Sequence, residues 1–165
     1  MTSAPVRDPL ADHLITPQNA ALLLIDYQPA QLAGVRSMDR ALLVKNAVST
    51  VSTIKTFAVP VVHSTINVAT GRRKLIICAL WTEICMAFIA LDALREGYEV
   101  YPVVDAIGGT SPEAHRAGLD RVIQAGRQPI SWVSLAVELQ RDWARQDTVA
   151  AVVEIVLTDR LLKEQ

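Results

Sequence analysis

The chain has 165 residues, of which 51% are hydrophobic, and its formal net charge is −1. A chain of this size and composition can bury one sizeable core, so we expect a single domain over residues 1–165. The near-neutral charge, without a long basic run, argues against a nucleic-acid partner. No apolar run approaches the ~20 residues that span a bilayer, which argues against a membrane partner.

Cys78 and Cys85 are the two cysteines of the chain. Two cysteines are too few for a disulfide framework, and their spacing is not that of a common zinc site. The first twenty residues lack the apolar core of a signal peptide. We therefore expect a cytoplasmic protein.

Apolar runs of strand length alternate with stretches of helical periodicity along the chain. Several of these runs are continuous, which is typical of parallel strands buried on both faces. In chain order we predict an N-terminal arm (1–18), a strand (20–26), a loop (27–29), a helix (39–57), two strands (59–65 and 74–80), a helix (83–96), a strand (99–105), a helix (111–125), a strand (128–132), a helix (134–143) and a tail (148–165) with a further apolar stretch.

This alternation predicts an α/β protein with three layers, in which helices flank an open parallel sheet of the Rossmann-like type. In such sheets, ligands bind beyond the carboxyl ends of the strands. Asp26, Leu80 and Asp105 end three of the predicted strands, so we expect all three at that edge.

One connection is too short for this architecture. About eight residues join the predicted strands at 59–65 and 74–80, whereas a parallel crossover needs about a dozen or more. We expect a missing segment between Ile66 and Lys74, either deleted from the gene or present in the molecule and skipped in the numbering.

The strongest chemical signal lies at Cys85, where an amphipathic helix follows the apolar run 74–80. The dipole of a helix N-terminus lowers the pKa of a thiol there, and its free N–H groups can hold an oxyanion. Asp26 ends the first strand at the same edge and can serve as the base. The backbone N–H groups of Cys85 and Trp81 can serve as oxyanion donors.

Two motifs, Leu22-Leu-Leu-Ile-Asp-Tyr-Gln28 and Thr82-Glu-Ile-Cys85, resemble the isochorismatase-like cysteine hydrolase superfamily. The segments 105–108 and 112–115 also resemble it, and the likeness runs over about residues 18–145. The resemblance implies an isochorismatase-like hydrolase fold of the branch without metal. It also implies a small-molecule substrate, an amide or a related compound, and no cofactor.

The resemblance assigns roles to individual residues. Asp26 would accept the thiol proton, and Cys85 would attack a carbonyl or imine-like carbon to form a covalent intermediate. The peptide bond Leu80–Trp81 would be cis, which turns the Trp81 N–H into an oxyanion hole. Gln28 and Thr82 would belong to the pocket.

The third catalytic residue of the family, a lysine or an arginine, comes from the interval that is shortened here. Arg72, Arg73 and Lys74 lie at the opposite edge of the predicted sheet, and we expect this run to be solvated. The Asp and His ligands of the metal-binding branch come from the same interval, so we expect no metal. An alternative therefore stays open: a catalytically impaired or non-catalytic oligomeric protein on the same scaffold.

Several conspicuous residues favour structural roles instead. Cys78 lies in mid-strand and is expected to be a core thiol. Glu83 is expected to be a first-turn carboxylate favoured by the helix dipole. His63 is expected in the core or a pocket wall, and His115 on a helix surface.

An oligomer is expected as well. Residues 132–143 are similar to a subgroup of uncharacterised homo-oligomeric hydrolases. Trp132, Trp143 and the apolar stretch 149–157 would supply more apolar surface than a small sheet needs. We therefore expect a homo-oligomer.

Overall fold

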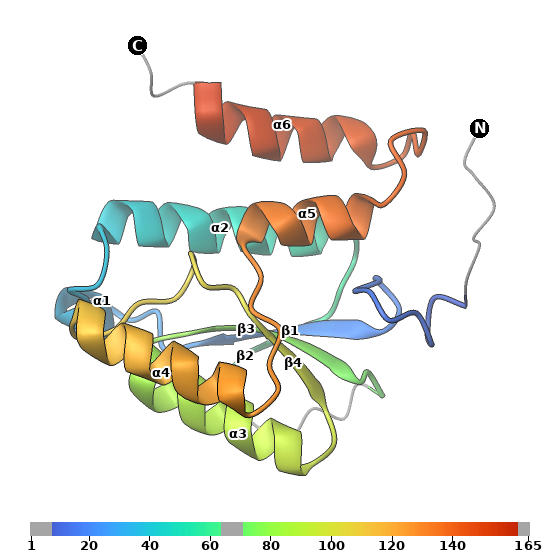
Figure 1. The fold of residues 1–165 in the computed structure, drawn as a ribbon. Coiled ribbons are helices and arrows are strands. Elements are labelled where there is room, and N and C mark those ends of the chain that lie inside the picture. The colour runs from blue at the N-terminus through green and yellow to red at the C-terminus, as the bar shows by residue number, and fades with distance from the viewer. Residues whose placement is uncertain (1–7, 64–70, 162–165) are drawn as a thin grey trace.

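The computed structural model describes residues 8–63 and 71–161, with the side chains of His63 and of residues 158–161 outside the description. Four parallel strands form one sheet, and helices cover both of its faces (Figure 1). The elements are, in chain order, β1 (Ala20–Ile25), α1 (Pro29–Gly34), α2 (Arg40–Thr56), β2 (Val61–His63), β3 (Lys74–Ala79), the π-helix η1 (Thr82–Met86), α3 (Ala87–Arg95), β4 (Glu99–Pro102), α4 (Pro112–Gln124), α5 (Trp132–Gln140) and α6 (Val149–Leu161).

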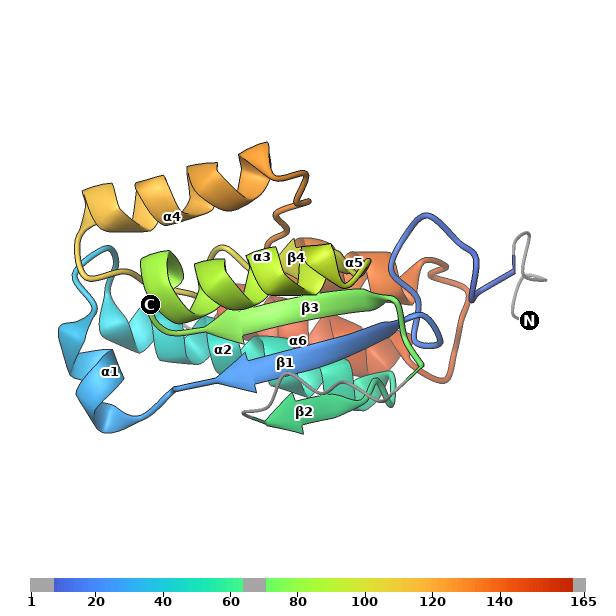
Figure 2. The ribbon, with the colours of Figure 1, turned by 90° about the horizontal axis from the view of Figure 1, so that it is seen from below.

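The strand order is β2-β1-β3-β4, so β1 and β3 are the interior strands (Figure 2). All six residues of β3 are buried, as are five of the six residues of β1. Ile25 pairs with Ala79 at the carboxyl end of the two strands. Asp26 and Leu80 therefore leave the sheet at the same level, side by side.

Side chains alternate between the two faces of the sheet, as the strand period requires. Leu22 and Cys78 belong to the core on the side of α2 and α5, whereas Ala21 and Ile77 belong to the core on the side of α3. α6 packs on α2 and α5 as an additional outer helix (Figure 1). The predicted α/β architecture with a flanked parallel sheet is thus confirmed. Within the described residues, no helix is long and apolar enough to cross a membrane.

The helix predicted at 111–125 is confirmed together with its ends. The Ser111 hydroxyl accepts the Ala114 N–H at 3.0 Å, and Pro112 occupies the first turn. Gly126 follows the helix with a φ of 93°, a conformation that favours glycine at this position.

The structure differs from the prediction at two places near the carboxyl edge of β1 and β4. The loop predicted at 27–29 is present at residues 27 and 28, but Pro29 already begins α1, a six-residue helix that was not predicted. The strand predicted at 128–132 is reduced to one bridge, between Ile130 and Val103. Pro129 has no N–H to donate, which limits pairing on this segment.

The start of α5 also differs from the prediction. The helix begins at Trp132 rather than at Ser134, because the Ser131 hydroxyl accepts the Ser134 N–H and so caps the first turn. It ends at Gln140, so Trp143 lies outside it. Trp132 is 5% exposed and belongs to the core, whereas Trp143 is 52% exposed. Only the second of these tryptophans supplies the expected apolar surface.

The predicted gap between Ile66 and Lys74 falls largely outside the described residues, as do the last residues of the strand predicted at 59–65. β2 covers Val61–His63 of that strand. The missing segment stays a prediction.

Candidate active site

Asp26 and Cys85 meet at the carboxyl edge of the two interior strands. Asp26 directly follows β1 and has a φ of 60°, a value that few residues other than glycine adopt. Cys85 lies in η1, the turn of π-helix that follows β3. The Asp26 carboxylate lies close enough to the Cys85 thiol to raise its pKa. The structure therefore brings together the two residues that the sequence predicted as base and nucleophile.

Burial raises the pKa of the Cys85 thiol above its usual value, and the hydrogen bond and charge of Asp26 raise it further. The backbone N–H groups of Trp81 and Cys85 lower this pKa because they stabilise the thiolate. None of these groups is a cation. On balance the pKa of the Cys85 thiol is raised, and Asp26 is the acceptor beside it.

The turn before Cys85 has an unusual backbone. The Leu80–Trp81 peptide bond is cis, at the position that the resemblance implies. The Trp81 carbonyl accepts the N–H of Ile84 at 3.1 Å and that of Met86 at 3.2 Å. The N–H groups of Trp81 and Cys85 lie near enough to the sulfur to lower the pKa of the thiol. An oxyanion formed beside this sulfur would have two donors within reach.

The Trp81 indole ties this turn to α1. Its N–H donates to the Gln31 carbonyl at 2.8 Å, and its ring lies against Gly34, where a Cβ atom would come within 2.4 Å of the ring. Gln28 occupies the N-cap position of α1, although its side chain makes no capping hydrogen bond. Sequence reasoning missed this helix, and with it the contact that fixes Trp81.

Thr82, which the resemblance assigns to the pocket, is completely buried at the start of η1. Its hydroxyl lies 2.8 Å from His115 Nδ1, and its N–H donates to the Gly108 carbonyl at 3.0 Å. His115, expected on a helix surface, is thus half-buried against the turn. Burial lowers the pKa of His115, and the nearby charge of Glu83 partly offsets this effect.

Glu83 lies in the first turn of η1, as predicted. It also makes a contact that the sequence did not indicate: its Oε1 accepts the Thr110 N–H at 3.1 Å and the Thr110 hydroxyl at 2.6 Å. Thr110 follows two consecutive glycines, which was the one available signal of a close approach in this loop.

Cys78 in β3 and Asp105 after β4 have structural roles. Cys78 is completely buried, and burial raises the pKa of its thiol to about 12, which fits the predicted core thiol. The Asp105 carboxylate accepts the Trp132 N–H at 2.9 Å at the start of α5. Burial raises the pKa of Asp105, and the hydrogen bond from Trp132 opposes this shift. Asp105 therefore holds α5 and is not bonded to Cys85.

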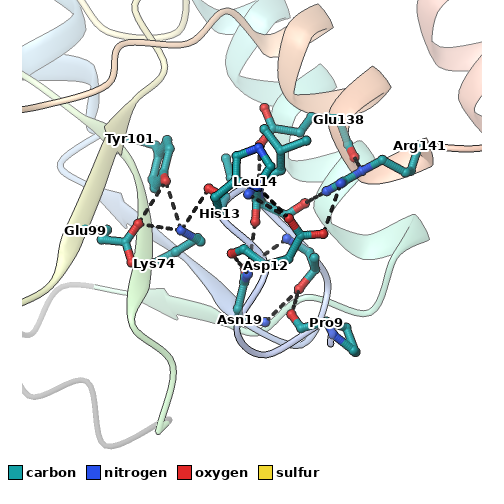
Figure 3. Close-up of polar contacts among 12 residues, drawn as sticks. Pro9, Asp12, His13, Leu14, Asn19, Lys74, Glu99, Tyr101, Glu138 and Arg141 are labelled. Carbon is teal, nitrogen blue, oxygen red and sulfur yellow. Dashed lines mark hydrogen bonds and ion pairs between the residues drawn. The ribbon is translucent and has the colours of Figure 1, made fainter. Parts of the chain in front are cut away.

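The expectation of a solvated basic run is wrong for Lys74. This side chain is 3% exposed and donates to the Glu99 carboxylate, to the Tyr101 hydroxyl at 3.1 Å and to the His13 carbonyl at 3.2 Å (Figure 3). Lys74 begins β3, at the end of the strand opposite Cys85. Its charge therefore serves the N-terminal arm and β4. Within residues 8–63 and 71–161, no cluster of His, Cys, Asp and Glu could hold a metal ion.

The chain resembles known proteins in sequence and in fold. Residues 66–134 match the family model of the isochorismatase domain. A stretch of 75 residues is 45% identical to the probable hydrolase YcaC of Escherichia coli (strain K12). That match covers 46% of this chain and only 36% of the relative.

The likeness in fold extends much further. The structure of YcaC from Pseudomonas aeruginosa with hexane-2,5-diol and covalent acrylamide has a TM-score of 0.83 and 26% identity, over 90% of this chain and 92% of that one. The E. coli YcaC structure, described as an octameric hydrolase of unknown specificity, has a TM-score of 0.80 and 26% identity, over 90% and 93%.

Proposed function

Because the chain belongs to the isochorismatase-like cysteine hydrolase superfamily, we propose that it is a hydrolase whose nucleophile is the Cys85 thiol. The proposed substrate is a small amide or a related molecule. The observation that carries the proposal is that the Asp26 carboxylate and the backbone N–H groups of Trp81 and Cys85 all act on the Cys85 thiol and shift its pKa.

The reaction follows from these positions. Asp26 takes the thiol proton while Cys85 Sγ bonds to the carbonyl carbon, and the N–H groups of Trp81 and Cys85 hold the resulting oxyanion. The oxyanion collapses, the C–N bond breaks, and protonated Asp26 gives its proton to the departing amine. Asp26 then takes a proton from water, whose oxygen bonds to the thioester carbon. The C–S bond breaks, the acid leaves, and Asp26 returns the proton to the Cys85 thiolate.

The raised pKa of Cys85 defines what Asp26 contributes. A thiol that keeps its proton at rest needs a base at the moment of attack. A cation supplied by the interval between Ile66 and Lys74 would reduce this need for a base. We propose that this interval is shortened within an otherwise single domain. Intact mass of the protein from its natural source, compared with the printed sequence, tests the shortening.

The central experiment replaces the nucleophile. A panel of small amides is screened for release of ammonia or amine, and Cys85→Ala is expected to lose activity by on the order of 10³-fold or more. Cys78→Ala is the matched control, because it removes a buried thiol that is not bonded to Asp26. Acrylamide is expected to form one adduct on the native wild-type protein, at Cys85. Undiminished hydrolysis by Cys85→Ala would refute the assignment of Cys85 as the nucleophile, whereas a wild-type protein that hydrolyses none of the amides would favour the non-catalytic scaffold.

We also propose that the protein is a homo-oligomer, since the E. coli relative is described as an octameric hydrolase. Apolar side chains remain exposed on the outer helix α6 and just before it. Val153 is 37% exposed, Leu157 45% and Trp143 52%. A second copy of the chain would cover such a surface.

A further inference from the structure

We propose that Glu83 is a positioning residue that fastens the Cys85 turn to the loop at residues 108–110. This inference rests on the proposed function, because it concerns how Cys85 is held beside Asp26. The sequence interpretation gave Glu83 only a favourable interaction with the helix dipole, which any anion in the first turn would make.

The contact between Glu83 and Thr110 is specific. Glu83 Oε1 accepts two hydrogen bonds from one residue, from the backbone N–H at 3.1 Å and from the hydroxyl at 2.6 Å. Hydrogen bonds to an ionised carboxylate are roughly twice as strong as those between neutral groups. Glu83 lies two residues before Cys85 in the same turn of π-helix. A shift of this side chain would therefore move the backbone that carries the thiol.

The loop that holds Glu83 is itself anchored on both sides. Gly108 forms a bridge with Leu80 and accepts the Thr82 N–H, so it contacts the chain on both sides of Trp81. The Gly109 N–H donates to the Ser37 hydroxyl at 2.9 Å, which joins the loop to the segment between α1 and α2. These contacts hold the loop in place without Glu83, so the loop can in turn hold the Glu83 side chain.

Close packing restricts the space around Glu83. A Cβ atom at Gly109 would lie 2.7 Å from Glu83 Oε2, and one at Gly118 of α4 would lie 2.8 Å from Glu83 Cα. The two glycines let the loop and α4 approach the glutamate from two directions. Glu83 Oε2 is buried and has no hydrogen-bond partner among the described residues, so Oε1 alone makes the tie.

If Glu83 acts through its hydrogen bonds to Thr110, matched variants should behave differently from what a purely electrostatic role of Glu83 predicts. Glu83→Gln keeps an oxygen acceptor for Thr110 and removes the charge. Glu83→Ala removes both, and Thr110→Val removes the hydroxyl bond while the charge stays. A positioning role therefore groups Glu83→Gln with the wild type and Thr110→Val with Glu83→Ala. An electrostatic role groups the two Glu83 variants together and leaves Thr110→Val unchanged.

The readout is the pH midpoint of acrylamide addition to Cys85, measured by mass spectrometry on the full chain. The hydrogen bond to Asp26 raises this midpoint, so loosening the turn should lower it. We expect a drop on the order of one pH unit for Glu83→Ala, a smaller drop for Thr110→Val, and none for Glu83→Gln. Glu113→Ala, an exposed first-turn carboxylate of α4, is the control and should leave the midpoint unchanged.

Addition to Cys78 reports unfolding in the same spectrum, because that thiol is completely buried. A variant that only destabilises the fold would modify both cysteines together. Suppose that the wild-type pH midpoint of addition to Cys85 is high. If no variant changes it, or if both Glu83 variants change it equally, the positioning role is overturned while the proposed function stands. A wild-type midpoint equal to that of an ordinary thiol would instead remove the Asp26 pairing, and with it the proposed function.

Discussion

Asp26 reaches Cys85 because the chain turns sharply directly after β1. Its φ of 60° lies in the left-handed region, where a short polar side chain is tolerated better than a branched one. The register of β1 and β3 brings Ile25 opposite Ala79. Position in the sheet and local backbone conformation together put a carboxylate beside the thiol.

Asp26→Asn should separate thiolate formation from catalysis. The amide lacks the negative charge that raises the pKa of Cys85, so the midpoint of acrylamide addition is expected to fall toward that of an ordinary thiol. Hydrolysis should nevertheless drop by about 10²-fold or more, because no base takes the proton at the moment of attack. A pH profile of adduct formation and an amide-hydrolysis assay check the two directions. A rise in both rates would contradict the role of Asp26 as the base.

The site residues differ in how far the sequence could indicate them. Asp26 and Cys85 end or follow strands, so the order of elements alone predicts that they share an edge. The Glu83–Thr110 contact depends on the conformation of a glycine-containing loop, which no periodicity encodes. Lys74 was expected in solvent because three basic residues are adjacent, yet the N-terminal arm and β4 cover it.

At the scale of elements, β3 carries polar anchors at both of its ends. Cys85 follows its carboxyl end, while Lys74 at its start contacts Glu99 and Tyr101 of β4 and the carbonyl of His13 in the arm (Figure 3). Burial lowers the pKa of Lys74, but the hydrogen bonds and charges of Glu99 and Tyr101 outweigh it, so the net pKa is raised. The stabilisation is fully present below the unfolded-state pKa of lysine and is lost as the pH rises through the folded-state value.

Glu99→Gln is expected to lower the free energy of unfolding by about 1–2 kcal/mol at pH 7, because it weakens a charge-assisted contact of a buried cation. Glu99 is itself 48% exposed, which keeps the effect below that of a fully buried pair. Urea unfolding followed by circular dichroism measures the difference. Glu96→Gln, an exposed neighbour, should change little. Equal stability of the two variants would show that Lys74 needs no anionic partner.

Elements with strong periodicity were predicted well, and short ones were not. The interior strands and α2 differ from their predicted ranges by one residue at most ends, because burial imposes their pattern. α1 has only six residues, too few to establish a helical period. The predicted strand at 128–132 has the composition of a strand, yet Val103 offers Ile130 only one bridge. The π-helical start at Thr82 depends on the backbone around Trp81 rather than on side-chain pattern.

At the scale of the whole molecule, α6 packs on α2 and α5 while its Val153 and Leu157 side chains stay exposed. If a second copy covers the other side, the double variant Val153→Lys/Leu157→Lys should yield a smaller particle by size-exclusion chromatography with light scattering. Burying two lysine charges in a contact is strongly unfavourable. Ile123→Lys on α4, 43% exposed and in the opposite layer, is the matched control. An unchanged assembly in the double variant would place the interface elsewhere.

The strand order has a consequence for how this protein can diversify. β1 and β3 each pair with a neighbour on both sides, and β2 forms the edge from which the interval before β3 departs. Insertions or deletions in that interval therefore leave the pairing of Ile25 with Ala79 untouched. The length of this interval can therefore change while Asp26 and Cys85, the proposed base and nucleophile, keep their spacing. Libraries that vary the length or sequence of this interval should therefore retain the Asp26–Cys85 pair.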